Sequence, residues 1–219
     1  MHPSLSLIKA VGFDLDRTLY SNTPKMTEQV AQEIFKAILR FKPELKTIER
    51  VEKIYKKRGE ELHSWSKVLD EIGVEKSRKV VNSCLDSANI IDLIGEDRKL
   101  VRIMQKLHQK FFLFLITRSV KDQATKKLAK IGIRPELFHF SSFGDDPHSL
   151  TENFAKNFKY FLSISPYQPR EHVYIGDDPR MDVTPPKNLG MKTILVREYC
   201  EEADFSITSI YEIADLLLP

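Results

Sequence analysis

Acidic side chains follow two hydrophobic segments that lie far apart in the sequence. The first segment covers residues 7–15 and the second covers 172–175, and both are rich in residues that favour β-strands. The acidic residues at their ends are Asp14, Asp16, Asp177, Asp178 and Asp182. Because charged groups next to buried segments are costly without a function, these residues are the first candidates for a site.

Carboxylates that gather at one place need a positive charge. Two of them 4 Å apart repel each other by about 4 kcal/mol at an effective dielectric constant near 20. Oxygen ligands without His or Cys nearby favour a hard cation, and a small number of carboxylates favours Mg²⁺ that keeps some of its waters. The acidic residues therefore predict a magnesium site, provided that the fold brings them together.

The elements around these residues alternate between strands and helices. Strands are predicted at 7–15, 111–117, 138–143, 172–175 and 191–196, and helices at 97–109, at 120–131, from Ser149 onward and at 209–218. This alternation is typical of βαβ units, so we expect an α/β core with a doubly wound, Rossmann-like parallel sheet. Ligands of such sheets bind outside the carboxyl ends of the strands, where the acidic residues lie.

One long segment breaks this alternation. Apolar residues at helical spacing run through residues 22–95, and no convincing strand is found there. We therefore expect two domains. The α/β core comprises residues 1–21 and 96–219, and an inserted all-helical cap domain comprises residues 22–95. The cap is expected to act as a lid over the carboxyl end of the first strand.

Composition excludes several classes of protein. With 42% hydrophobic and 30% charged residues among 219, the chain is typical of a folded globular protein. Its longest strongly apolar run, 111–116, is too short to cross a bilayer. Asp14 and Asp16 interrupt the first hydrophobic segment, which is unlike a signal peptide. We therefore expect a cytoplasmic protein without a membrane partner.

Charge and cysteine content point the same way. The 34 Lys and Arg residues exceed the 31 Asp and Glu residues by three, and this surplus is spread along the chain, so no nucleic-acid partner is expected. Only Cys84 and Cys200 are present, which is too few for a disulfide scaffold. The oligomeric state cannot be deduced from these features.

Three short motifs resemble those of a known family. Residues 13–20 read Phe-Asp-Leu-Asp-Arg-Thr-Leu-Tyr, which is similar to the first motif of the haloacid dehalogenase (HAD) superfamily, Asp-x-Asp-x-Thr after a hydrophobic strand. Ile116-Thr117 resembles the second motif, and Gly176-Asp177-Asp178 with Asp182 resembles the fourth. The motif order and the helical insert after the first motif match the phosphatase branch, so the resemblance covers nearly the whole chain.

The resemblance implies a role for each acidic residue. Asp14 would be the nucleophile that forms an aspartyl phosphate, and Asp16 would act as general acid and then as general base. Members of the family that displace halide lack an Asp at the position of Asp16, so its presence favours phosphate chemistry. The metal ligands would be the side chains of Asp14 and Asp177 and the carbonyl of Asp16. Asp178 and Asp182 would act through water or support the ligands.

The resemblance also implies residues that bind phosphate or substrate. These are Thr18, Thr117, Arg118 and a lysine from a third motif. The family usually places that lysine about 25 residues before the fourth-motif Asp, which is Glu152 in this sequence. We favour Lys156, in the helix expected to begin with a capping box formed by Ser149 and Glu152, because it is nearer the helix N-terminus. Lys159 is the alternative, and both could be solvated helix residues.

Arg118 and the second Gly-Asp-Asp sequence each have two interpretations. Arg118 follows Thr117, where the family usually has a small or amide residue, and it could bind a second anionic group of the substrate or form a salt bridge with a neighbouring loop. The sequence 144–146 repeats the letters of the fourth motif. It has no Asp five residues after its first Asp, so we expect a loop rather than a second metal site.

The sequence therefore predicts a Mg²⁺-dependent phosphomonoesterase that acts on a small phosphorylated metabolite. A phosphomutase or phosphotransferase of the same fold would share Asp14 and Asp16, and only product analysis would separate the two. A non-catalytic binding module with this fold is the alternative from another class. The identity of the substrate lies beyond the sequence.

Overall fold

The computed structural model describes residues 2–62, 64–147, 149 and 155–219. The chain separates into two compact units, which comprise residues 1–21 with 94–219 and residues 22–93. The sequence placed this division two residues later, at 95/96. Among the described residues, no helix is long and apolar enough to cross a membrane.

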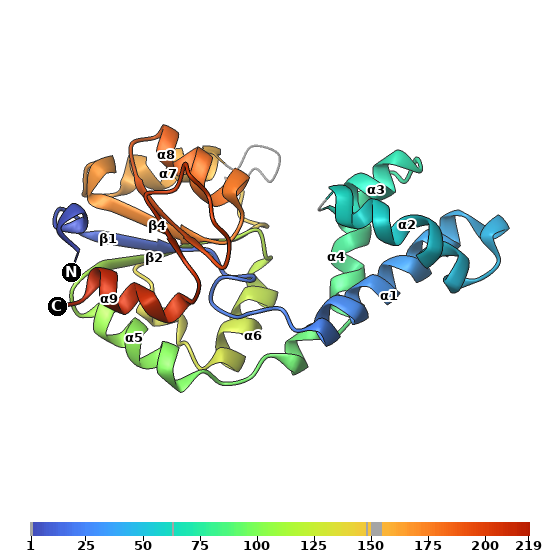
Figure 1. The fold of residues 1–219 in the computed structure, drawn as a ribbon, viewed down its shortest axis with the longest axis horizontal. Helices are drawn as coiled ribbons and strands as arrows, with labels where there is room; N and C mark the ends of the chain where they lie inside the picture. The colour runs from blue at the N-terminus through green and yellow to red at the C-terminus, as the bar shows by residue number, and fades with distance from the viewer. Residues whose placement is uncertain (1, 63, 148, 150–154) are drawn as a thin grey trace. The chain divides into compact units, whose positions relative to one another are not determined.

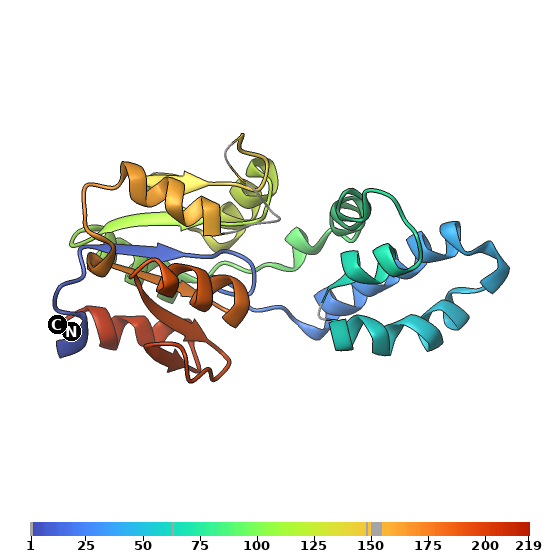
Figure 2. The same ribbon diagram turned by 90° about the horizontal axis from the view of Figure 1, so that it is seen from above.

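A parallel sheet of six strands forms the centre of the first unit, in the order β3-β2-β1-β4-β5-β6. Its strands are β1 (Ala10–Phe13), β2 (Phe112–Ile116), β3 (Phe140–Ser142), β4 (His172–Gly176), β5 (Lys192–Val196) and β6 (Phe205–Ile207). Figure 2 shows them side by side. The order reverses direction at β1, as in a doubly wound sheet, so the predicted fold class is confirmed. The sequence missed β6, because three residues are too few to show a period of two.

Helices cover both faces of this sheet. On one face lie α5 (Arg98–His108), α6 (Lys121–Ile131) and α9 (Ile213–Leu217), and on the other lie α7 (Ala155–Ile164) and α8 (Thr184–Asn188) (Figure 1). The two ends of the unit meet, since the amide of His2 donates a hydrogen bond to the carbonyl of Leu216 at 2.8 Å (Figures 1 and 2). Because both faces are covered, the central strands β1 and β2 are apolar along their whole length.

Short helical turns join many of these elements. One-turn 3₁₀ segments occur at Pro3–Leu5, Pro43–Leu45, Ile90–Leu93, Pro135–Leu137, Pro169–Glu171 and Ile210–Glu212, and a π-helical turn occurs at Pro179–Val183. The helix predicted at 209–218 is thus a 3₁₀ turn followed by the short α9. The π-helical turn follows β4 almost directly and carries one of the acidic residues of the site.

Aromatic side chains fill the face of the sheet under α7. Phe114 stacks on Phe161 with ring centroids 4.0 Å apart, and Phe158 meets Tyr174 edge-on. Gly12 lies between these strands, and a Cβ atom there would come within 2.2 Å of the Phe114 ring. A glycine in the central strand β1 therefore lets the aromatic rings of the neighbouring strands close over it.

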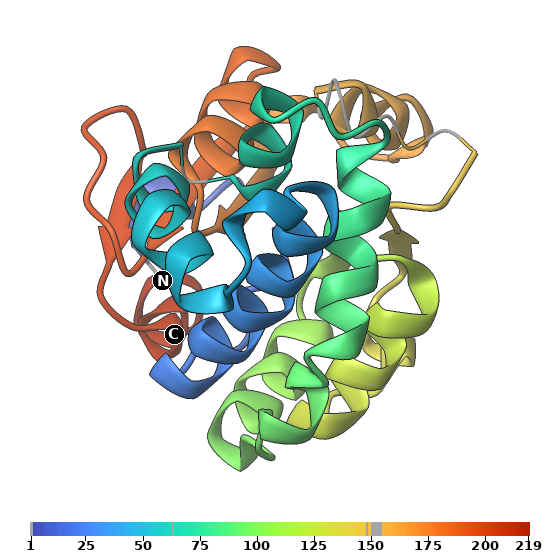
Figure 3. The same ribbon diagram turned by 90° about the vertical axis from the view of Figure 1, so that its right-hand side faces the viewer.

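The second unit is helical throughout its described residues. Its helices are α1 (Pro24–Phe41), α2 (Ile48–Leu62), α3 (Trp65–Glu71) and α4 (Ser77–Ser87), and Figure 3 shows α1 beside α4. Ile34, Ile38, Val51 and Leu69 are buried in its own hydrophobic core. Thr23 begins α1 by accepting a hydrogen bond from the amide of Met26. The described residues of this unit thus form helices, as expected for the insert, and pack around a hydrophobic core of their own.

Candidate active site

The two central strands bring the first and fourth motifs to the same edge of the sheet. Phe13 at the end of β1 pairs with Ile175 of β4, and the amide of Asp14 donates a hydrogen bond to the carbonyl of Ile175 at 2.9 Å. Asp14 and Asp177 therefore leave adjacent strands at nearly the same level. The rule that ligands bind at the carboxyl ends of parallel strands places any site here.

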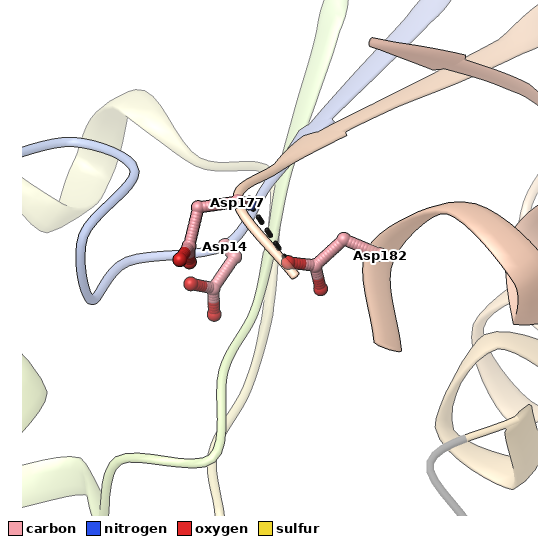
Figure 4. Close-up of side chains that lie close together, drawn as sticks. All are labelled: Asp14, Asp177 and Asp182. Atoms are coloured by element: carbon pink, nitrogen blue, oxygen red, sulfur yellow. Dashed lines mark hydrogen bonds between the residues drawn. The ribbon is translucent and has the colours of Figure 1, made fainter. Parts of the chain in front are cut away.

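Three carboxylates meet at this edge. One oxygen from each of Asp14, Asp177 and Asp182 lies within 4.8 Å of the others, and Figure 4 shows the carboxylates of Asp14 and Asp177 pointing toward each other. Carboxylate oxygens are the ligands that Mg²⁺ and Ca²⁺ prefer. Among the described residues, these three form the one group of acidic, His or Cys side chains close enough to hold a metal ion.

Hydrogen bonds from the backbone hold the Asp182 carboxylate in this group. Its Oδ2 atom accepts a hydrogen bond from the amide of Asp177 at 2.9 Å (Figure 4). It accepts another from the amide of Asp178 at 3.0 Å. A Cβ atom at residue 176 would lie 2.2 Å from the carboxyl carbon of Asp182, so only glycine allows this approach. The Gly-Asp-Asp motif therefore needs its glycine to let the carboxylate of Asp182 reach the end of β4.

The electrostatics of these three carboxylates are unfavourable. Burial, and then the charges of Asp182, Asp16 and Asp177, raise the pKa of Asp14 well above its ordinary value. Burial is also the main reason that the pKa of Asp182 rises to about 7, although the amide of Asp178 opposes the change. Like charges in a partly dry site favour the protonated forms. A bound cation would remove this penalty.

Two arginines supply part of the missing charge. Arg17 Nε lies 3.2 Å from Asp177 Oδ2, but its side chain is 54% exposed. Burial raises the pKa of Asp177, and the charge of Arg17 lowers it again in part. Arg118 is exposed, and its charge lowers the pKa values of Asp14 and Asp182. Because solvent screens both arginines, neither replaces a cation held between the carboxylates.

Asp16 has different surroundings, although it lies two residues from Asp14. Tyr20 Oη and Lys127 Nζ both contact its Oδ1 atom, at 2.5 and 2.6 Å, and Ser119 Oγ donates to its Oδ2 atom at 2.5 Å. Burial alone would raise the pKa of Asp16, but the charge of Lys127 and the donated hydrogen bonds outweigh it and lower the pKa. Asp16 is thus fully provided with donors from the chain itself.

A tight turn separates the two environments. The amide of Leu19 donates to the carbonyl of Leu15, so the chain forms a helical turn that places Tyr20 on the same side as Asp16. Arg17 lies within this turn with φ of 64°, a left-handed conformation that is uncommon for a residue with a side chain. The guanidinium of Arg197 donates to the carbonyls of Arg17 and Thr18 and thereby holds the turn.

Lys127 was not among the site residues predicted from the sequence. It lies on the buried face of α6 with Ala124, Leu128 and Ile131, and it is the one buried lysine among the described residues. A lysine at an apolar position of an amphipathic helix could have indicated a buried ion pair, because lysine is almost never fully buried unless it is paired. The sequence could not identify its partner, since Asp16 lies 111 residues earlier in the chain.

The lysines favoured from the sequence lie elsewhere. Lys156 and Lys159 are both exposed on α7, and within the described residues no hydrogen bond or ion pair joins either to an acid of the site. Glu152, at the usual position of the family's lysine and in the expected capping box, lies outside the described residues. The structure therefore places Lys127, and not Lys156, against an acid of the first motif.

The remaining candidates lie close to these groups or support them. Thr18 is buried, with its hydroxyl 3.4 Å from Asp14 Oδ2, and Thr117 is buried at the end of β2, where its Oγ1 accepts from the amide of Ser119. The carboxylate of Asp178 instead accepts from the amide of Arg180 and stabilises the turn after β4. Asp178 thus has a structural contact of its own.

The second Gly-Asp-Asp sequence supports a helix. Asp145 Oδ1 accepts from the amide of Lys121 at the start of α6, and Asp146 Oδ2 accepts from the amide of Phe143. Both carboxylates therefore have local backbone partners, as expected for a loop. By capping α6, Asp145 also helps to fix the helix that carries Lys127.

Comparisons with known proteins agree with this geometry. The chain is 25% identical to a glyceraldehyde 3-phosphate phosphatase of Methanocaldococcus jannaschii, with 96% of this chain and 97% of that protein covered. Its fold is similar to that of a HAD phosphatase from Thermococcus onnurineus, with a TM-score of 0.67, 20% identity and coverage of 96% and 98%.

A second solved structure and a family model complete the comparison. The structure is a HAD-hydrolase of Bacillus subtilis bound to magnesium, with a TM-score of 0.62, 18% identity and coverage of 97% and 99%. The model for haloacid dehalogenase-like hydrolases matches residues 8–190, which include every motif discussed above. With its acidic motifs at the ends of β1 and β4 and a match over most of its length, the chain belongs to the haloacid dehalogenase-like hydrolases.

Proposed function

We propose that the protein is a Mg²⁺-dependent phosphomonoesterase that acts on a small phosphorylated metabolite through an aspartyl phosphate on Asp14. The observation that carries this proposal is the contrast between Asp14, which lies in a carboxylate cluster short of positive charge, and Asp16, which lies beside it with its own donors. A nucleophile next to a cation site and a separate acid-base group are the parts that this reaction needs.

The donor set fits magnesium. Asp14 and Asp177 would bind the ion directly with the carbonyl of Asp16, and the buried Asp182 lies close enough to contribute as well. All of these ligands are oxygen atoms. Burial and neighbouring carboxylates raise the pKa values of Asp14 and Asp182, a penalty that a bound cation would offset. When bound, the ion supplies Lewis-acid stabilisation of the phosphoryl oxygens.

Two proton transfers accompany the two chemical steps. The Asp14 carboxylate attacks phosphorus, and the bond from phosphorus to the leaving oxygen breaks while Asp16 gives that oxygen a proton. A water molecule then attacks the aspartyl phosphate and passes a proton to Asp16, which releases inorganic phosphate and restores Asp14. Asp16 thus ends the cycle with the proton that it lost at the beginning.

Other residues of the α/β unit would bind the substrate. Thr18 lies within the turn after β1 and Thr117 directly follows β2, and the hydroxyls of both would donate to phosphoryl oxygens. Arg118 is exposed and near the carboxylates, and it would bind the phosphoryl group or a second anionic group of the substrate. The helical unit would serve as the cap that excludes water and selects the leaving group.

A phosphate-release screen over phosphomonoesters tests this proposal. The panel includes triose phosphates, because the M. jannaschii relative is a glyceraldehyde 3-phosphate phosphatase. We expect turnover with Mg²⁺, none with EDTA, and a loss of at least about a thousandfold in Asp14→Asn. Turnover that survives in Asp14→Asn would refute the role of the nucleophile. Phosphate that reappears on another hydroxyl would indicate a phosphomutase, and silence over the whole panel would favour a binding module.

A further inference from the structure

Lys127 is an unusual lysine within the part of the chain that the structure describes. Its side chain is 8% exposed, whereas Lys121, Lys126 and Lys130 of the same helix are exposed. Its Nζ atom lies 2.6 Å from Asp16 Oδ1 and 2.8 Å from Ser119 Oγ. Burying an ammonium group costs free energy unless the group is paired, and the contacts with Asp16 and Ser119 offset this cost.

The contacts around Lys127 form a closed triangle. Lys127 donates to Ser119 Oγ, Ser119 donates to Asp16 Oδ2, and Lys127 also donates to Asp16 Oδ1. Tyr20 adds a second donor to Oδ1. Both oxygens of Asp16 are therefore fixed, and the carboxylate cannot rotate without breaking a charge-assisted hydrogen bond.

We propose that Lys127 is the positioning residue of Asp16, and that it orients this carboxyl group for proton transfer to the leaving oxygen and from the attacking water. This role rests on the proposed function. Oδ1 receives two donors and Oδ2 receives one hydroxyl, so Oδ2 is the oxygen that exchanges the proton. The proton moves from Oδ2 to the leaving oxygen as its bond to phosphorus breaks, and the water returns a proton in the second step.

The origin of this lysine in the fold supports the proposal. Lys127 comes from α6, the helix that follows β2, and Asp145 caps the first turn of that helix. Leu128 and Ile131 anchor the same face of α6 in the core. A rigid, capped helix thus holds the ammonium group against Asp16, which is the support that a proton-transfer group requires.

Substrates with different leaving groups separate positioning from simple stabilisation. An alkyl phosphate expels an alkoxide that needs a proton, whereas 2,4-dinitrophenyl phosphate expels an anion that needs none. General acid catalysis typically contributes about 10² to 10⁴ in rate, and only the first substrate uses it in the first step. The decisive quantity is the single-turnover rate constant of the first step for each substrate, measured with Mg²⁺ in the same preparation.

We expect Lys127→Met to slow the first step with the best alkyl phosphate of the screen by roughly 30-fold or more. The dinitrophenolate burst should keep its rate within about threefold, because that step does not use the Asp16 proton. Lys126→Met is the matched control, since Lys126 is the exposed neighbour paired with Asp122. It should behave as wild type with both substrates. Asp16→Asn should reproduce the selective loss of Lys127→Met.

The ratio of the two rate constants keeps the test valid if part of the variant misfolds, since inactive molecules affect neither single-turnover rate constant. Lys127→Gln provides a second variant that keeps a donor without the charge. Equal losses with both substrates, or no loss with either, would overturn the role of Lys127 while leaving the proposed function intact. A wild-type protein that releases phosphate from neither substrate would overturn the proposed function and this role together.

Discussion

Asp14 and Asp16 are two residues apart on one turn and have opposite electrostatic surroundings. Asp14 shares its edge of the sheet with Asp177 and Asp182, and its pKa is raised. Asp16 receives donors from Tyr20, Ser119 and Lys127, and its pKa is lowered. We name the first group the open carboxylate cluster and the second the closed Asp16 cluster.

The difference shows how one short motif can serve two tasks. The open carboxylate cluster is neutralised only in part, by exposed arginines, and suits an external cation, whereas the closed Asp16 cluster carries its cation within the chain. Metal binding and proton transfer should therefore be separable by mutation.

The largest effect is expected from breaking the open carboxylate cluster. Asp177→Asn removes one of the charged groups expected to bind the ion. It should weaken Mg²⁺ binding by about 100-fold, because losing a residue that only supports a metal ligand already costs about 10- to 100-fold in affinity. Isothermal titration calorimetry with MgCl₂ measures this effect. Asp122→Asn, an exposed acid on α6, should bind Mg²⁺ like the wild type. An equal loss of Mg²⁺ affinity in Lys127→Met would contradict the separation of the two clusters.

The second effect is a dependence of stability on pH. The pKa of Asp182 is raised from 3.8 to about 7, so its contribution to stability is complete below pH 4 and is lost as the pH rises through 7. The loss is at most about 1.4 kcal/mol per pH unit, or about 3–6 °C in Tm per pH unit at this chain length. In EDTA, the Tm should fall as the pH rises from about 4.5 to 7 and should level off above about pH 8, and Mg²⁺ should restore it near pH 7.

The closed Asp16 cluster should behave in the opposite way. The pKa of Asp16 is lowered from 3.8, so its contribution is present above pH 4 and is lost as the pH falls further. It therefore adds no slope between pH 4.5 and 7, where Asp182 lowers the stability. Calorimetric scans of Asp182→Asn in EDTA should show a weaker dependence of Tm on pH between 4.5 and 7 than the wild type. An unchanged slope would refute the assignment to Asp182.

A smaller effect is expected from Tyr20→Phe, which removes one of three donors to Asp16. We expect a loss of roughly threefold to tenfold in turnover of an alkyl phosphate, because one hydrogen bond contributes about 0.5–1.5 kcal/mol and two donors remain. Mg²⁺ affinity should not change. Tyr199→Phe, at an exposed tyrosine, is the control. A loss of Mg²⁺ binding in Tyr20→Phe would contradict the functional separation of the two clusters.

The smallest effect is expected at Arg17, which pairs with Asp177 across 3.2 Å and is largely exposed. Arg17→Gln should strengthen Mg²⁺ binding by about two- to threefold, because the arginine opposes the cation and exposed ion pairs contribute at most about 1 kcal/mol. The difference should shrink at high salt. Calorimetric titrations at two NaCl concentrations test this, and weaker Mg²⁺ binding in Arg17→Gln would reverse our view of this contact.

Local patterns in the sequence determined the parallel α/β fold, the position of the acidic residues and the family. Apolar runs that end at Asp14 and Asp177 define strands, and parallel strands bring their carboxyl ends to one edge whatever lies between them. The helical segment was also readable, since its period differs from that of the strands around it. These features depend on residues close together in the chain.

Only the tertiary structure decided which charges meet. Asp182 enters the open carboxylate cluster because Gly176 leaves room for it, and Lys127 reaches Asp16 because α6 packs with that face toward the sheet. The sequence favoured Lys156 instead, because the family's usual position holds Glu152 and Lys156 lies near the expected N-terminus of the helix. Contacts between residues more than 100 positions apart depend on how helices rotate and pack, and no local pattern records that rotation.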